Sequence, residues 1–389
     1  MVVCANMQGK SILWLSSLIL DMHLHKTTQI EILQALAERG HKVHLVASYS
    51  SMKNLHELEN VKTTQIPLRY IPIFSTTAYV LFLLLYMPLF LLRWRPDFVI
   101  VEPLTAVIGV QSRFLLPRSK TVLDIRSGPV GSRKHTSTII FFSIAIIIAR
   151  KFHQGITTIT SLSKKELCEK YKIDSKLVGV WTSGVSKERF SPKKYSASKI
   201  RKDLGLDDKF VVFYHGYLGR ERGIIETIKA VELLKNDYPN IVLFLLGNDE
   251  INWKDMIREL GLQNVVVIHD PVSYIEVPKY IAICNVGIVP LPDLPCWRHQ
   301  CPLKLLEYLS MEKVVITSDI PANREILGNS KCGIYISTVK PKEIANAIVY
   351  AYNNRDLLME WGACGRIIIE ERYSWTKVAN DLENHLFRL

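Results

Sequence analysis

Short apolar segments alternate with amphipathic helical patterns along almost the whole chain. A strand, a helix and a second strand in succession form a βαβ unit, and such units build parallel sheets that helices cover on both faces. The pattern therefore predicts an α/β fold. In the first half, the segments expected to be strands are residues 12–18 (ILWLSSL), 42–48, 97–103, 121–127 and 155–161.

The second half repeats the alternation after a stretch rich in Ser, Lys and turn formers at residues 182–198. A chain of 389 residues is too long for one ordinary core. We therefore expect two Rossmann-like domains, residues 1–187 and 188–372, with parallel sheets facing a central cleft, and a helix within 373–389 that crosses back to the first domain. The strands expected in the second domain are residues 209–216, 240–247, 264–270, 284–292, 313–319 and 332–337.

The positive charge is confined to the first half. Residues 1–187 carry 23 Lys and Arg against 11 Asp and Glu, whereas the rest of the chain carries 26 of each. This asymmetry predicts that one domain meets an anionic partner. The seven cysteines are scattered and form no CxxC pair, so reduced thiols and no structural metal are expected.

Two apolar stretches of the first half stand apart from the strand pattern. Residues 78–92 are apolar all round and contain Pro88, and residues 139–149 are similar. Each is shorter than the roughly 20 residues that cross a bilayer. One interpretation places them as buried helices of the first domain. The other lets them dip into a membrane surface whose anionic headgroups hold the basic half.

A loop after the strand at 209–216 has the features of a phosphate site. Gly216 ends the strand, Arg220 and Arg222 follow, and Gly223 opens a helix. Free N–H groups at a helix start, together with guanidinium groups, bind phosphates. A solvated charged loop would have the same sequence. The chain contains neither GxGxxG nor GxxxxGK[ST], which disfavours a dinucleotide dehydrogenase or a P-loop enzyme.

The stretch CPLKLLEYLS at residues 301–310 can supply the other half of a nucleotide site. Pro302 is expected at the first helical position. Glu307 then lies about a turn and a half into the helix, where its two oxygens suit the vicinal hydroxyls of a ribose. An exposed helix residue with no ligand is the alternative.

Five segments, in one order along the chain, resemble motifs of the retaining glycosyltransferases of family 4, whose fold is the two-domain GT-B architecture. The resemblance runs through nearly the whole chain and is densest from about Ile156 to Trp375. The segments are ITTITSLSKKEL, TSGVSKERFSP, YHGYLGRERGI, PVSYIEVPKYIAICNVGIVPLP and PLKLLEYLSMEKVVITSDIPANREIL.

The resemblance implies a nucleoside diphosphate sugar bound mainly by the second domain, with Glu307 on the ribose and Arg222 at the family's phosphate-binding lysine. It also implies no cofactor and no metal, because helix dipoles and basic side chains neutralise the leaving diphosphate. Two positions depart from the family: Tyr217 replaces an arginine, and His299 replaces a glutamate that contacts the transferred sugar. The expected donor-binding residues are Gly216, Arg220, Arg222, Pro302, Leu303, Lys304 and Glu307, and the catalytic candidates are Asp124, Arg126 and His299.

The acceptor side is expected in the first domain. His23 and His25 lie in the loop after the first strand, and Arg133 and Lys134 lie in a Gly-containing loop after 121–127. Their charges suit an anionic acceptor, although solvated loops would look the same. A lipid-linked acceptor with a phosphate head would account for both the basic half and the apolar stretches.

The sequence therefore predicts a peripheral glycosyltransferase at the cytoplasmic face of a membrane, whose partners are a nucleotide sugar, a lipid-linked or glycan acceptor and an anionic membrane surface. Alternatives are a non-catalytic subunit that binds sugar nucleotide, prompted by Tyr217 and His299, and a GT-B sugar-nucleotide epimerase. Nucleic-acid binding is not expected, because the chain has a sequence pI near 9.2 but no recognition motif.

Overall fold

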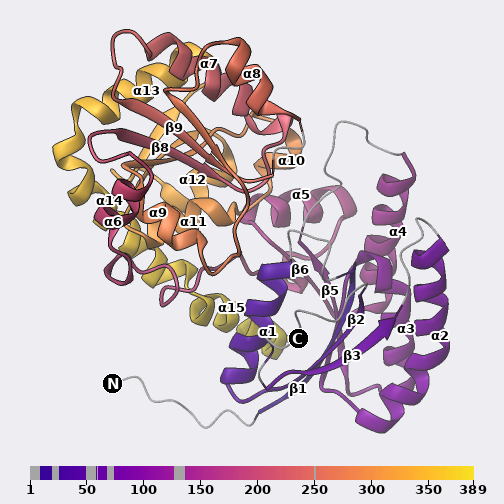
Figure 1. Ribbon diagram of the computed structural model, residues 1–389. Coiled ribbons are helices and arrows are strands. Elements are labelled where there is room, and N and C mark those ends of the chain that lie inside the picture. The colour runs from indigo at the N-terminus through magenta and orange to yellow at the C-terminus, as the bar shows by residue number, and fades with distance from the viewer. Residues whose placement is uncertain are drawn as a thin grey trace. The chain divides into compact units, whose positions relative to one another are not determined.

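The computed structural model describes residues 9–19, 26–49, 58, 60–67, 74–126, 136–248 and 251–389. The chain divides into two compact units. The first comprises Met1–Thr182 together with Trp375–Leu389, and the second comprises Ser183–Ser374. Each unit is built on one parallel β-sheet (Figure 1). This is the two-domain α/β architecture that the alternating pattern predicts, although the first boundary lies at residues 182 and 183 instead of 187 and 188.

The sheet of the first unit has the strand order β3-β2-β1-β4-β5-β6-β7. Every pairing is parallel, and β1 lies between β2 and β4. The strands are β1 (Ser11–Ile19), β2 (Lys42–Tyr49), β3 (Lys62–Pro67), β4 (Phe98–Val101), β5 (Lys120–Ile125), β6 (Gly155–Thr158) and β7 (Val178–Val180). The helices are α1 (Lys26–Glu38), α2 (Phe74–Trp94), α3 (Ala106–Leu115), α4 (Thr136–Phe152), α5 (Ser161–Tyr171) and α15 (Trp375–Arg388).

Helices cover both faces of this sheet because its strand side chains are apolar on both sides. On one face, α1 and α15 pack against strand residues such as Ile12 and Trp14. On the other, α2, α3 and α4 pack against residues such as Leu13 and Leu15. The alternation of neighbouring residues of β1 between the two cores follows from the two-residue period of a strand.

The sheet of the second unit has the order β10-β9-β8-β11-β12-β13, again with every pairing parallel. Its strands are β8 (Phe210–His215), β9 (Ile241–Leu246), β10 (Val266–His269), β11 (Val286–Val289), β12 (Val314–Ser318) and β13 (Gly333–Ile336). Its helices are α6 (Ala197–Asp203), α7 (Ile224–Leu234), α8 (Trp253–Glu259), α9 (Val277–Ile283), α10 (Pro295–Arg298), α11 (Leu303–Ser310), α12 (Pro321–Leu327), α13 (Pro341–Asn353) and α14 (Leu358–Ile368).

Strand β8 of the second unit contributes side chains to both faces of its sheet. Val212 and Tyr214 join the core formed with α7 and α13. Phe213, between them, contacts the ring of Tyr308 from α11, whose hydroxyl donates to the Phe213 carbonyl oxygen at 2.9 Å. These contacts connect α11 directly to β8, and the predicted phosphate loop begins where β8 ends.

The C-terminal helix α15 returns to the first unit, where it packs on α1. Its buried Glu383 receives a hydrogen bond from Nε of Arg39 at 2.6 Å and lies 3.0 Å from Nε2 of His41. The chain thus crosses from the second unit back to the first after Ser374.

Candidate donor-binding site

The strand order of the second unit reverses between β8 and β11, and this point of the sheet fixes the candidate site. Open parallel sheets bind ligands beyond the carboxyl ends of their strands at such a reversal. Strand β8 ends at His215, and Gly216 follows with φ of 104°. A side chain is strained at this φ, and a Cβ on Gly216 would also approach Lys304. Glycine therefore keeps the backbone turn open beside the candidate site.

Helix α11 brings Glu307 to the same place. Glu307 is 2% exposed, and its Oε2 lies 3.1 Å from Nε2 of His215. A side chain packed this close to a buried carboxylate restricts its orientation by contact. The helix begins at Leu303, so Pro302 is the residue before the helix and not its first residue as predicted. Pro302 therefore leads directly into the helix that carries Glu307.

Lys304 lies one turn before Glu307 on α11. Its Nζ is 3.5 Å from the centre of the Tyr214 ring and is buried, with no hydrogen-bond partner among the residues that the structure describes. Burial lowers the pKa of Lys304 well below its ordinary value, the nearby charge of Arg222 lowers it further, and Glu307 opposes both. A buried amine that lacks an acceptor is costly to keep, so the position fits an anionic ligand that would supply one.

Arg222 adds a second cationic group to the cluster. Its guanidinium lies 4.9 Å from the Trp297 ring and 5.6 Å from the Tyr217 ring, measured to the ring centres. Arg222 is half-buried, whereas Arg220 is exposed at the start of the short 3₁₀ turn Arg220–Arg222. The structure thus brings Arg222 close to Lys304, with Arg220 at the outside of the same turn.

Leu303 is the last of the predicted donor-binding residues, and the catalytic candidate His299 lies just before it in the chain. His299 follows α10, and Leu303 opens α11; both are half-buried. The neighbouring Arg298 forms a two-point ion pair with Asp293, at 2.5 and 2.7 Å. That pair fixes the backbone just before His299, on the segment that leads into α11.

The cluster joins two kinds of chemistry. Glu307 offers carboxylate oxygens, which accept hydrogen bonds from paired hydroxyl groups. Lys304 and Arg222 offer an ammonium and a guanidinium group to phosphate oxygens. A ligand with a diol at one end and a diphosphate at the other would satisfy both. Among the residues that the structure describes, no group of His, Cys, Asp and Glu side chains is arranged to hold a metal ion.

In the first unit, Asp124 and Arg126 both contact Trp181. The carboxylate of Asp124 accepts from Oγ1 of Thr157 at 2.7 Å and from Nε1 of Trp181 at 2.9 Å. Arg126 lies 3.5 Å over the Trp181 ring and donates to its carbonyl oxygen at 2.6 Å. Asp124 is 1% exposed, and burial raises the pKa of its carboxyl group. The catalytic roles of both residues stay predictions, as does that of His299.

A second polar cluster lies where the strand order of the first sheet reverses, between β1 and β4. Nε2 of Gln29 donates to Oε1 of Glu102 at 3.0 Å, and Oγ of Ser16 lies near both side chains. The hydroxyl of Tyr79 donates to the Ser16 carbonyl oxygen at 2.7 Å. This cluster makes Glu102 a further acceptor-side candidate. The predicted acceptor residues His23, His25, Arg133 and Lys134 lie outside the described residues.

Sequence reasoning missed the partners of the predicted donor residues. His215 and Tyr214, on β8, contact Glu307 and Lys304, and Trp297 contacts Arg222. The position of His215 as the last residue of an apolar strand, directly before Gly216, was the available signal. Polar residues at the carboxyl end of a parallel strand lie at the ligand-binding edge of the sheet.

Two protein-family models match the chain in succession. Residues 27–189 match the model described as "Glycosyltransferase Family 4", and residues 196–367 match "Glycosyl transferases group 1". Among curated proteins, the capsular polysaccharide biosynthesis glycosyltransferase CapM of Staphylococcus aureus is 25% identical over 372 residues. That alignment covers 92% of this chain and 91% of CapM.

Solved structures agree with the fold of the whole chain. HepE of Anabaena in complex with UDP has a TM-score of 0.75 at 16% identity, covering 98% of this chain and 100% of HepE. The sucrose-phosphate synthase of Thermosynechococcus elongatus has a TM-score of 0.76 at 15% identity, covering 97% and 98% of the two chains. At these identities the likeness establishes the two-domain GT-B fold alone.

Proposed function

Because the chain belongs to glycosyltransferase family 4, with the glycosyl transferases group 1 domain in its second half, we propose that it transfers a sugar from a nucleoside diphosphate sugar to an acceptor with retention of configuration. Glycosyl transfer is the family's activity. The donor, the stereochemistry and the acceptor are our proposals.

The observation that carries the donor proposal is that Lys304 and Glu307 lie one turn apart on the same face of α11. Glu307, oriented by His215 at 3.1 Å, accepts hydrogen bonds from the two ribose hydroxyls. The buried Nζ of Lys304 then gains a phosphate oxygen as its acceptor. HepE, which shares the fold, has been solved with UDP and with UDP-glucose, so uridine nucleotides are the first donors to try.

The reaction requires that negative charge growing on the departing diphosphate be stabilised. Lys304 lies beside Gly216, and Arg222 is near enough to lower the pKa of its amine, so two basic groups are in place at the turn. Arg222 supplies its charge directly, and Lys304 supplies a second charge once the diphosphate raises the pKa of its amine. In this proposal they neutralise the leaving diphosphate, as a metal ion does in other reactions with a phosphate leaving group. The enzyme then needs neither a metal nor a cofactor. Activity that persists in EDTA is the expected result, and activity restored only by a divalent cation would contradict it.

The acceptor is proposed to be a lipid-linked glycan used in cell-surface polysaccharide synthesis, with the protein at the cytoplasmic face of a membrane. The similarity to CapM, whose name places it in capsular polysaccharide biosynthesis, supports the polysaccharide. The excess of basic residues in residues 1–187 supports an acceptor with a phosphate head. The Ser16–Gln29–Glu102 cluster and Arg126 are the described groups of the first unit nearest to such a role.

Donor binding can be tested with UDP-, GDP- and ADP-sugars in thermal-shift measurements on three proteins: the wild type, Glu307→Ala and Glu360→Ala. Glu360 is an exposed glutamate of the same unit and serves as the matched control. We expect one nucleotide class to stabilise the wild type and Glu360→Ala but not Glu307→Ala. Equal stabilisation of all three proteins would remove Glu307 from the site, and no stabilisation by any nucleotide sugar would overturn the donor proposal.

The second candidate is a non-catalytic subunit that binds the nucleotide sugar and serves a partner enzyme. It is favoured by the two departures from the family motifs, Tyr217 and His299. Incubating the purified protein with labelled donor and membrane lipid extract separates the two functions. Product formed by the protein alone establishes the transferase, whereas donor binding without product, restored by adding a cell extract, establishes the subunit.

A further inference from the structure

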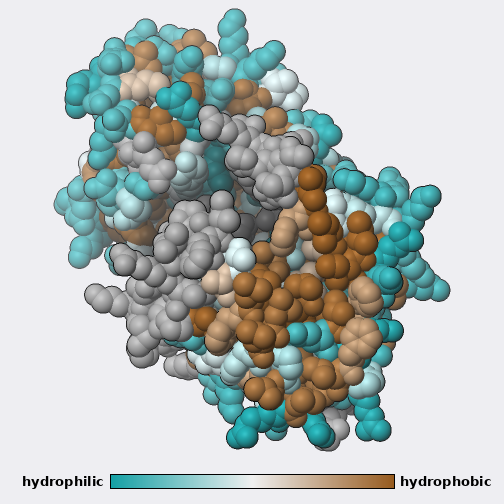
Figure 2. All heavy atoms as spheres, turned by 90° about the vertical axis from the view of Figure 1, so that its right-hand side faces the viewer, coloured by the Kyte–Doolittle hydropathy of each residue, from teal (hydrophilic) through white to brown (hydrophobic). Residues whose placement is uncertain are grey.

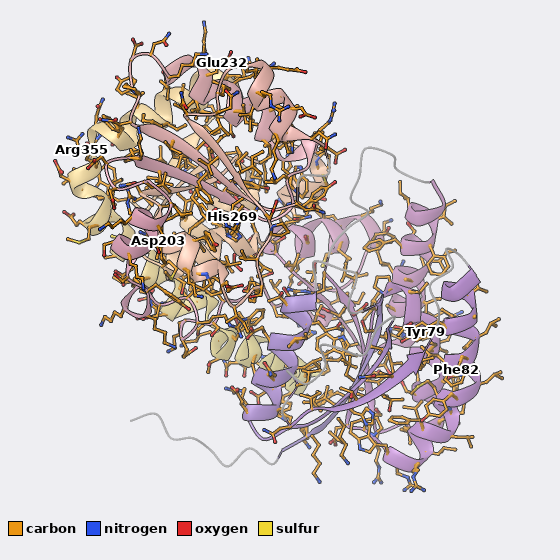
Figure 3. All side chains as sticks on the ribbon, in the orientation of Figure 1. Tyr79, Phe82, Asp203, Glu232, His269 and Arg355 are labelled. Atoms are coloured by element: carbon orange, nitrogen blue, oxygen red, sulfur yellow. The ribbon has the colours of Figure 1, made fainter. Side chains whose placement is uncertain are left out.

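Helix α2 has two apolar sides, and one of them faces outward. Tyr79, Leu83, Met87 and Leu91 are each no more than 3% exposed and pack on the sheet. The opposite stripe is open: Leu85 is 81% exposed and Leu89 is 73% exposed, with Leu81, Phe82 and Leu92 beside them. Figure 3 shows the contrast at two labelled residues, with Tyr79 directed toward the sheet and Phe82 on the outer side of the helix.

Helix α4 repeats this arrangement. Ala145, Ile146 and Ala149 are buried in the same core, while an outward stripe of large apolar side chains runs along the helix. That stripe consists of Ile139, Ile140, Phe141, Ile144 and Ile147, each between 37% and 57% exposed.

Helix α3 packs against both α2 and α4, and it contributes the exposed Phe114. The outward stripes of the three helices therefore lie on one side of the sheet, and we call them together the apolar face. In Figure 2 they account for the brown area over α2 and α4. Soluble monomers rarely expose a contiguous apolar area of this kind without a partner.

The charges of the same helices are all of one sign. Residues 74–94, 106–115 and 136–152 contain no Asp or Glu. Their basic residues lie in the last turn of each helix: Arg93, Arg113, and Arg150 with Lys151. An apolar stripe with cations at its border, and without acidic groups, complements the acyl chains and the anionic headgroups of a bilayer.

We propose that α2, α3 and α4 form a membrane-docking face that inserts in the plane of an anionic phospholipid bilayer. Among the described residues, α2 is the one helix long and apolar enough to cross a membrane. Crossing would pull its inner stripe, Tyr79 to Leu91, away from the sheet along the whole helix. The helix therefore lies in the interface with its outer stripe in lipid and its inner stripe in the protein core. This inference rests on the proposed function and deepens it, because a lipid-linked acceptor is embedded in a bilayer and the docking face would bring the enzyme to it.

Vesicle flotation with the purified full-length protein tests the proposal directly. Vesicles of phosphatidylcholine alone are compared with vesicles that also contain phosphatidylglycerol, at low and high salt. We expect the protein to float with the anionic vesicles, and a bound fraction to survive high salt because apolar insertion is insensitive to screening. Replacing Arg150 and Lys151 by Gln should reduce the preference for anionic vesicles.

The decisive variant is Leu85→Glu combined with Leu89→Glu. Both side chains are strongly exposed, so the change leaves the core intact while it places charge in the apolar face. Binding should fall by at least about tenfold. Met359→Glu is the matched control, since Met359 is 83% exposed on α14 of the second unit and should have no effect. If the double variant floats like the wild type, the proposal is wrong.

A second copy of the chain is the other occupant that the experiment can reveal. A wild type that stays unbound to both vesicle types, and that elutes as a dimer which Leu85→Glu with Leu89→Glu dissociates, would overturn the membrane proposal and assign the face to self-association. Stabilisation by UDP-sugar is measured on the same samples. If the wild type binds a UDP-sugar but floats with neither vesicle type, the membrane-docking proposal alone is rejected. If the wild type floats but binds no nucleotide sugar, the proposed function alone is rejected.

Discussion

Oε2 of Glu307 lies 3.1 Å from Nε2 of His215, so the last residue of β8 contacts the buried carboxylate of α11 at the edge of the sheet. The side chains are 3% and 10% exposed, respectively. In such surroundings the imidazole limits the orientations available to the carboxylate. Glu307 is then preorganised for a diol instead of being ordered by the ligand when it binds.

Replacement of His215 by Asn is therefore expected to weaken donor binding even though the carboxylate remains. We expect about a tenfold loss of affinity, equivalent to about 1.4 kcal/mol, because the ligand must now order Glu307. Titration calorimetry with the best nucleotide sugar measures the loss. His269→Asn, at the end of β10 in the same sheet, is the control. Wild-type affinity in His215→Asn would show that the contact with His215 does not orient Glu307.

Lys304 is expected to reduce the stability of the empty protein while it increases donor affinity. Its buried Nζ has no hydrogen-bond partner in the described part of the chain, so Lys304→Met removes a desolvated amine and keeps the packing of the stem. Urea denaturation should show a gain of about 1 kcal/mol in the free energy of unfolding. Donor affinity should fall by about tenfold to a hundredfold, because a charge-assisted phosphate contact is lost.

Lys313 provides the contrast to Lys304 within the same unit. Its Nζ donates to the carbonyl oxygens of Ala282 and Cys284, at 3.0 and 2.8 Å. Lys313→Met should lower the free energy of unfolding by about 1–3 kcal/mol, since these carbonyl groups lose their donor. If both substitutions change stability in the same direction, the interpretation of Lys304 as a residue kept for ligand binding is wrong.

Donor binding is expected to take up a proton. Burial, followed by the charge of Arg222, sets the pKa of Lys304 well below its ordinary value in the empty site, and a bound diphosphate would raise it. Between these two pKa values the empty protein holds a neutral amine and the complex holds an ammonium group. Affinity should therefore fall as pH rises through this window. Calorimetry in buffers of different ionisation enthalpy measures the uptake.

The same pKa shift predicts the opposite pH trend for stability without ligand. Within the window between the folded and unfolded pKa values, the unfolded chain binds the proton and the folded one does not, so stability should rise with pH. Lys304→Met should abolish both the proton uptake and this part of the stability trend. Proton uptake that persists in Lys304→Met would assign it to another group.

The sheets were predictable because their central strands are continuous apolar runs between helical patterns. Two strands at or near an edge were missed. Strand β3, KTTQIP, is the first strand in the sheet order, pairs with β2 and carries polar side chains, and β7, the last strand, has three residues. Each of them pairs with the strand that precedes it in the chain, and it is this pairing, not an apolar run of its own, that makes it a strand. The prediction therefore captured the centre of each sheet better than its border.

For the site, local spacing indicated Glu307 and the loop at Gly216, because helix starts and glycine turns have recognisable sequence patterns. It did not indicate the contact of Glu307 with His215, which depends on where α11 packs against β8. The buried amine of Lys304 has no hydrogen-bond partner among the described residues, and this too depends on burial and could not be predicted from the sequence. The apolar stripes were visible as composition, but their division into inner and outer sides needed the fold.

Glu383 is expected to hold the C-terminal helix on the first unit. It is 2% exposed and is bound by Nε of Arg39 and by His41, both from the segment around the end of α1. Glu383→Gln leaves these two groups facing an uncharged amide, which should destabilise the first unit by about 2–3 kcal/mol. Glu371→Gln, at an exposed position, is the control and should be neutral.

The two-unit structure allows this last effect to be localised. Donor stabilisation, which reports the second unit, should be unchanged in Glu383→Gln, while the first unit unfolds at lower urea. Proteolysis followed by mass spectrometry along the urea series tells which unit opens first, because a single transition is not assured for two domains. If early cleavage appears within Ser183–Ser374 instead, then α15 stabilises the second unit and the division of the chain at Ser374 does not describe how it unfolds.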